Sequence, residues 1–130
     1  MRIIEQTKEE VKKSGKREIE QRLINFSVDT ISFVKDLQIT ASPDLGNRLL
    51  KSVTFLCLNY GDVKEDDRKH ELLYKMTTCL EELRECHNSL RMSQMAKITG
   101  SEEQVNKLIK ECNELISIFV KSIDKITRSS

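Results

Sequence analysis

Residues 67–91 read DRKHELLYKMTTCLEELRECHNSLR. Apolar side chains recur in this segment at alternating steps of four and three, namely Leu72, Met76, Cys79, Leu83, Cys86 and Leu90. This spacing places side chains on one face of an α-helix, because about 3.6 residues make one turn. Leu73 and Leu80 widen the stripe. The segment therefore predicts an amphipathic helix that packs its apolar stripe against other helices.

Another helix is predicted to begin at Ser101, directly after Gly100. The Ser101 hydroxyl can accept the Gln104 backbone N–H while the Gln104 side chain reaches back, which is a capping box. The apolar positions of this helix are Val105, Leu108, Ile109, Cys112, Leu115, Ile116, Phe119, Ile123 and Ile126. Because this stripe is wider than a two-helix seam requires, part of it is expected to face a second subunit.

Two more helices are predicted earlier in the chain. The first carries Ile19, Leu23, Phe26, Ile31, Phe33, Val34 and Leu37. It ends before Pro43, since proline disfavours helix at the residue that precedes it. The next helix starts near Asp44 and is apolar nearly all round from Val53 to Leu58, which predicts burial on more than one side. The charged residues 62–69 predict a turn or a helix kink, with Asp66 or Asp67 capping the helix that follows.

The chain shows no alternating strand pattern, so the predicted fold class is all-α. Its 130 residues fit one domain, and four helices of about 30 Å can surround one core as an antiparallel up-down-up-down four-helix bundle. We expect residues 18–130 to form the bundle domain and residues 1–17 to form a basic extension. If Ser14-Gly15 breaks the helix, the extension is a mobile arm. Ile3, Ile4, Thr7 and Val11 would instead support an added helical turn or a strap on a neighbouring subunit.

Residues that could perform covalent chemistry are scarce. The four cysteines, Cys57, Cys79, Cys86 and Cys112, fall on apolar helix faces, which predicts buried reduced thiols in a cytoplasmic protein. Paired metal-ligand spacings are absent from the sequence, and the adjacent Cys86 and His87 point about 100° apart on a helix. No nucleophile elbow, phosphate loop or zinc-protease motif occurs. We therefore expect no enzyme activity, no metal and no cofactor. No apolar run reaches the roughly 18 residues of a membrane span.

Several segments, taken in order, resemble a known family. They are LGNRLLKS at 45–52, LNY at 58–60, KHELLYKM at 69–76 with LEEL at 80–83, and the Ser101-capped helix that ends in IFVKSI at 118–123. Over residues 18–127 the chain is similar to the four-helix-bundle proteins encoded in intervening sequences of bacterial large-subunit (23S) ribosomal RNA. It is equally similar to the accessory variability determinant proteins of diversity-generating retroelements.

The resemblance implies a homopentameric ring without a catalytic centre. It implies an accessory subunit that binds a reverse transcriptase and its RNA or single-stranded DNA. The alternative is a structural oligomeric scaffold of the intervening-sequence type with an unknown protein partner. The candidate residues of the subunit interface are Val53, Phe55, Leu58 and Phe119. One departure is the charge, because 22 basic and 21 acidic residues nearly balance, whereas the retroelement proteins are usually strongly basic.

Basic side chains nevertheless gather toward both ends of the chain. Residues 1–17 hold six basic and three acidic side chains, and residues 121–130 hold three and one. Both termini of an up-down-up-down bundle lie at the same end, together with the connection between its second and third helices. The candidate residues for binding nucleic acid or a partner are therefore Lys12, Lys13, Lys16, Arg17, Lys121, Lys125 and Arg128. The competing interpretation is a solvated surface of alternating charges.

Overall fold

The computed structural model describes the backbone of residues 2–40, 43–98 and 101–129, and the side chains within these ranges from residue 15 to residue 37 and from residue 43 onward. Within those ranges the chain forms four helices and no strand. They are α1 (Arg2–Thr40), α2 (Pro43–Gly61), α3 (Lys69–Met95) and α4 (Glu102–Arg128). The expected all-α fold class and the four helices are therefore confirmed.

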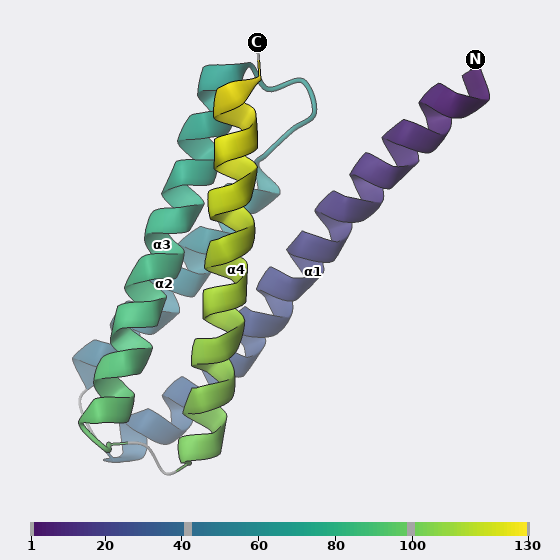
Figure 1. Ribbon diagram of the computed structural model, residues 1–130. Coiled ribbons are helices and arrows are strands. Elements are labelled where there is room, and N and C mark those ends of the chain that lie inside the picture. Colours follow the sequence, from purple (N-terminus) through teal and green to yellow (C-terminus); the bar gives the residue numbers. More distant parts are fainter. Residues whose placement is uncertain (1, 41–42, 99–100, 130) are drawn as a thin grey trace.

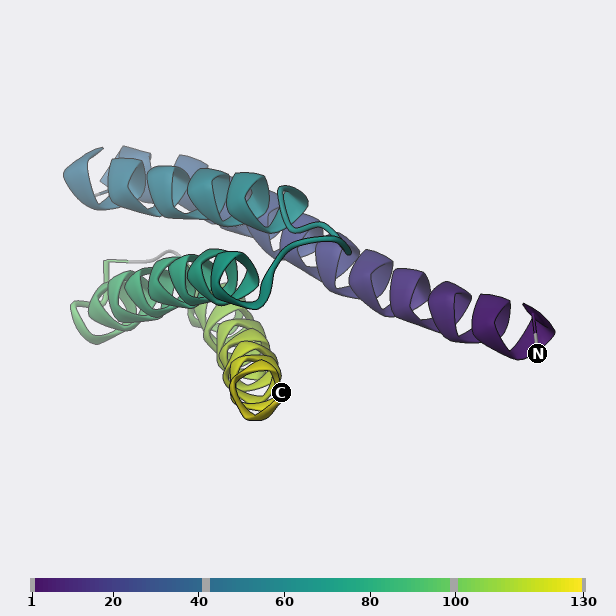
Figure 2. The ribbon, with the colours of Figure 1, turned by 90° about the horizontal axis from the view of Figure 1, so that it is seen from above.

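Each helix packs antiparallel against the next one in the chain, and α1 also contacts α4 along a shorter stretch (Figure 1). Viewed from above, α1 and α2 form one layer and α3 and α4 form the other (Figure 2). At 39 residues, or about 58 Å, α1 is twice as long as α2 with its 19 residues. Its amino-terminal half therefore runs past the end of α2 and away from α4. The helix continues through Ser14-Gly15 without a break.

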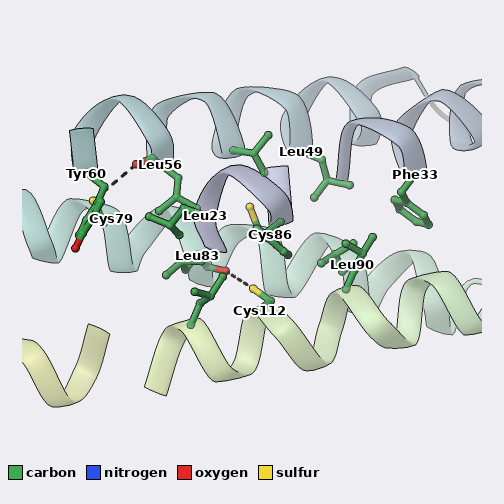
Figure 3. Close-up of a cluster of buried hydrophobic side chains, with 14 of the residues drawn as sticks. Leu23, Phe33, Leu49, Leu56, Tyr60, Cys79, Leu83, Cys86, Leu90 and Cys112 are labelled. Atoms are coloured by element: carbon green, nitrogen blue, oxygen red, sulfur yellow. Dashed lines mark hydrogen bonds between the residues drawn. The ribbon is translucent and has the colours of Figure 1, made fainter. Parts of the chain in front are cut away.

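The core lies between the two layers and is built from the predicted apolar stripes (Figure 3). Its largest fully buried side chains include Phe26, Phe33, Phe119, Leu23, Leu49, Leu56, Leu83, Leu90 and Leu115. Three of the four cysteines, Cys79, Cys86 and Cys112, are buried, and Cys57 is partly buried. The Cys112 thiol donates to the Leu83 carbonyl at 3.2 Å, which ties α4 to α3. The predicted burial is therefore confirmed for Cys79, Cys86 and Cys112, whereas Cys57 is only partly buried.

The helix starts show where local signals succeed and fail. Pro43 is the first residue of α2, where its missing N–H costs nothing. The Ser101 hydroxyl accepts the Gln104 backbone N–H at 3.2 Å, as the capping box predicts. The predicted cap of the third helix at Asp66 or Asp67 is wrong, because Arg68 occupies the cap position and no side chain caps it. The Asp67 carboxylate instead accepts the Lys64 backbone N–H at 2.8 Å within the loop.

The end of α3 contains a Schellman motif that the sequence did not predict. Ile98 N–H donates to the Ser93 carbonyl and Lys97 N–H donates to the Gln94 carbonyl, the pair of bonds that defines a Schellman motif. The motif needs a left-handed residue, and Lys97 supplies it with φ of 54°. Glycine is the usual residue at this position. The helix consequently ends at Met95, four residues beyond the predicted boundary at residue 91.

Candidate functional site

Of the nine exposed large apolar side chains among the described residues, five lie on α1 and α2, and Tyr74, Met92, Met95 and Val120 lie on α3 and α4. We define the α1–α2 outer face as Ile24, Val28, Ile31, Phe55 and Leu58, which are 41–65% exposed. On α1, spacings of four and three place Ile24, Val28 and Ile31 on one helix stripe next to the buried face. A 3.1 Å contact between Ser27 Oγ and Cys57 Sγ sets the register of the two helices. The stripe on α1 therefore runs beside the turns of α2 that carry Phe55 and Leu58.

The four interface candidates fall into two groups in this structure. Phe55 and Leu58 are exposed in the single chain and remain candidates. Val53 and Phe119 are at most 1% exposed, so the chain's own core already covers them. The Phe119 ring packs edge-on against Tyr60, with ring centroids 5.5 Å apart. In the single chain, helix α2 thus buries one side only, and the apolar side chains of Phe55 and Leu58 stay exposed.

A charged groove of about 350 Å³ adjoins Phe55 between α2 and α3. Its walls carry Arg48 and Lys51 on one side and Glu82 and Glu85 on the other. The buried Ser52 hydroxyl donates to Glu85 at 3.2 Å, and burial raises the pKa of Glu82. The Lys51 ammonium lies 5.8 Å from the centre of the Phe55 ring. Charged side chains that can form ion pairs therefore lie in this groove, next to Phe55 of the α1–α2 outer face.

A second groove, of about 490 Å³, separates α1 from α4. Polar side chains such as Asn25, Asp29 and Lys107 line it above the apolar Phe26 and Leu108. Arg22 on α1 pairs with Glu111 and, at 3.0 Å, with Glu114 on α4. These pairs raise the pKa of Arg22, chiefly through its hydrogen bond to Glu111. They hold the two helices together near the point where α1 begins to diverge.

The predicted basic residues whose side chains the structure describes do not form one patch. Lys16 donates to the Val63 carbonyl, and Arg128 pairs with Asp124 at 3.2 Å. The side chains of Lys12 and Lys13 lie outside the described residues. Arg17, Lys121 and Lys125 are exposed, but the amino-terminal half of α1 stands away from α4 in both views. Among the described residues, therefore, these cations lie on two separate helices, α1 and α4.

The α2–α3 loop adds negative charge at the same end of the bundle. It contributes Asp62, Glu65, Asp66 and Asp67. Lys75 on α3 donates to the Asp62 carbonyl and to Asp67 at 2.9 Å. The Lys64 backbone N–H and this lysine lower the pKa of the Asp67 carboxyl. The loop is thus fixed against the bundle, and its carboxylates offset the lysines and arginines nearby.

Basic side chains that were not among the sequence-predicted candidates lie on the adjacent helices α3 and α4. We define the basic seam as Arg84, His87 and Arg91 on α3 with Lys110 on α4. His87 and Arg91 precede Gln94 by seven and three residues, and Lys110 follows Asn106 by four. The Gln94 amide donates to the Asn106 side chain across the two helices. These spacings keep all four residues on the stripes that meet at this bond.

Electrostatics support this grouping of residues. Burial lowers the pKa of His87, and the charges of Arg91 and Arg84 lower it further. None of Arg84, Arg91 and Lys110 forms an ion pair with a described residue. The signal in the sequence was the R-x-x-H-x-x-x-R spacing at 84–91, which repeats at three and four residues beside the core stripe.

The thiols sit in surroundings that suppress their ionisation. Burial raises the pKa of Cys79 and of Cys112 to about 12, and it raises that of Cys86 as well. In the part of the chain that the structure describes, no three histidine, cysteine or carboxylate side chains lie close enough together to hold a metal ion. No helix within the same ranges is both long and apolar enough to cross a membrane.

Comparison of the chain with protein-family profiles, curated proteins and solved structures gives no match.

Proposed function

We propose that this protein is a non-enzymatic subunit that assembles with copies of itself into a cytoplasmic homopentameric ring. In this proposal the ring acts as an accessory factor that binds a reverse transcriptase and its RNA or single-stranded DNA. The family resemblance across residues 18–127 suggests both the ring and the partner. Four helices in the expected order, with lengths suited to such a bundle, support the architectural part.

The observation that carries the proposal is the α1–α2 outer face. Leu58 and Val28 are 65% and 57% exposed, and Ile24, Ile31 and Phe55 are 41–46% exposed. Monomeric proteins rarely leave a large contiguous apolar patch in water, because its burial against a partner is favourable by about 25 cal/mol per Å². The charged groove beside Phe55 adds a polar border, as subunit interfaces commonly have around an apolar centre.

Light scattering of the purified protein tests the assembly. We expect a mass close to five times the 15.1 kDa of the chain. The double variant Val28→Glu/Leu58→Glu should reduce the mass to that of one chain while the helix content persists, since both side chains are exposed in the single chain. Met95→Glu is the matched control, because Met95 is 72% exposed on α3, away from this face. A wild-type mass of 15.1 kDa at micromolar concentration contradicts the proposal.

The near balance of basic and acidic residues favours a second candidate function, a structural scaffold with a protein partner and no nucleic acid. The ring is common to both candidates, so the light-scattering experiment does not separate them. The gene neighbourhood separates the two candidate functions. A reverse transcriptase gene beside paired template and variable repeats supports the accessory role, and its absence supports the scaffold.

A further inference from the structure

We propose that the basic seam between α3 and α4 binds the phosphate backbone of nucleic acid, with Arg84, Arg91 and Lys110 as its cations. This inference rests on the nucleic-acid part of the proposed function and assigns it a surface. That surface differs from the one that the charges at the chain ends suggest.

The first support is the separation of charges around α3 and α4. Four carboxylates near the basic seam have neighbours on other helices, whereas Glu81, three residues before Arg84, is exposed. Glu82 and Glu85 line the groove toward α2, and Glu111 and Glu114 reach Arg22 on α1. Within the described residues, no ion pair offsets the charge of Arg84, Arg91 or Lys110.

The second support is the shape of the surface. Arg84 and Arg91 are seven residues apart on one helix, which separates them by about 10 Å along the axis. Lys110 approaches from a second helix, at a typical interaxial distance of about 8–10 Å. A single phosphate cannot fully engage cations spread over this distance. A polymer with a phosphate about every 3.4 Å of duplex axis on each strand can.

The third support is the chemistry of the neighbouring side chains. Asn88, Asn106 and Asn113 are exposed on the same turns and offer amide donors. None of the described residues 84–91 and 106–113 is aromatic. Aromatic side chains are enriched in protein–protein interfaces, whereas protein surfaces that bind nucleic acid are more polar and positively charged. The composition of the basic seam therefore favours a nucleic acid over an acidic protein.

The basic seam also lies away from the proposed assembly surface. The α1–α2 layer and the α3–α4 layer form opposite sides of the bundle (Figure 2). The basic seam, on α3 and α4, is therefore not part of the α1–α2 outer face. In a ring of five subunits, the three cations of each seam would be repeated five times.

Fluorescence anisotropy with a structured RNA hairpin and a single-stranded DNA tests the inference at about 50 and about 200 mM salt. The seam variant is Arg84→Gln/Arg91→Gln/Lys110→Gln in the full chain. We expect it to weaken binding at least about tenfold at the lower salt and to flatten the salt dependence by roughly 2 to 3 logarithmic slope units, since each neutralised phosphate contributes about 0.7–0.9. Light scattering and thermal unfolding should show unchanged assembly and folding, because the three side chains are exposed.

The matched control is Lys121→Gln/Lys125→Gln/Arg128→Gln, which removes the same formal charge from the end of α4. Equal losses in the two variants, or a larger loss in the control, overturn the seam assignment while leaving nucleic-acid binding intact. If neither probe binds the wild-type protein at the lower salt, the seam inference and the nucleic-acid part of the proposed function both fail. If an acidic polypeptide then binds and depends on the same three cations, the surface is a protein site instead.

Discussion

At the scale of single residues, burial keeps three thiols and one tyrosine hydroxyl of the core protonated. Cys79, Cys86 and Cys112 have raised pKa values, and burial raises the pKa of Tyr60 to about 12. The same thiols ionise near 9 when they are exposed in the unfolded chain. Above that pH the unfolded state binds fewer protons than the folded state, so the free energy of unfolding must fall as pH rises.

We therefore expect urea unfolding to show little change in stability from these groups below pH 9 and a progressive loss between about pH 9 and 12. The loss approaches about 1.4 kcal/mol per pH unit for each buried thiol. Cys112→Ala should lower stability at neutral pH, because it removes a buried side chain, and should make the alkaline loss less steep. Cys57→Ala is the comparison, since that thiol is only partly buried. An alkaline slope that Cys112→Ala leaves unchanged contradicts the argument.

At the scale of an element, the end of α3 holds a residue in an unfavourable conformation. Lys97 adopts φ of 54° so that the Schellman bonds to Ser93 and Gln94 can form. A left-handed conformation costs a side-chain-bearing residue roughly 1–2 kcal/mol, and glycine avoids this cost. Lys97→Gly should raise the free energy of unfolding by about 0.5–1 kcal/mol after its larger unfolded-state entropy is subtracted.

Ala96→Gly provides the opposite case one residue earlier. Ala96 has φ of −76°, so glycine gains nothing there and should destabilise by about 0.5–1 kcal/mol. Chemical denaturation of the two variants and the wild type measures both effects. If Lys97→Gly also destabilises the protein, the left-handed residue is not a source of strain at this helix end.

At the scale of the whole molecule, the described core begins late in α1. Its first members are Ile19 and Leu23, although the helix starts at Arg2. The division into an extension and a bundle domain remains a prediction, and removal of residues 1–14 tests it. We expect the shortened chain, which keeps Lys16 and its bond to Val63, to unfold cooperatively with a midpoint close to that of the full chain. A large loss of cooperativity would place the domain boundary earlier.

The sequence by itself determined the four helices, the faces they bury and the Ser101 cap. Each of these depends on local spacing, which a helix of 3.6 residues per turn translates directly into a face. Pro43 and the buried cysteines follow from the same local rules. These features needed no knowledge of which helices become neighbours.

Only the tertiary structure decided how each stripe and charge is used. Val53 and Leu58 belong to one apolar segment, yet the core takes Val53 and leaves Leu58 in water, because α2 meets α1 and α3 on one side only. The sequence suggested Asp67 as a helix cap. In the folded loop its carboxylate instead accepts the Lys64 backbone N–H and pairs with the Lys75 ammonium. Arg84 and Lys110 likewise lie on different helices, which only packing brings side by side. Spacing fixes the direction of a side chain on its own helix, whereas its partner depends on the assembled bundle.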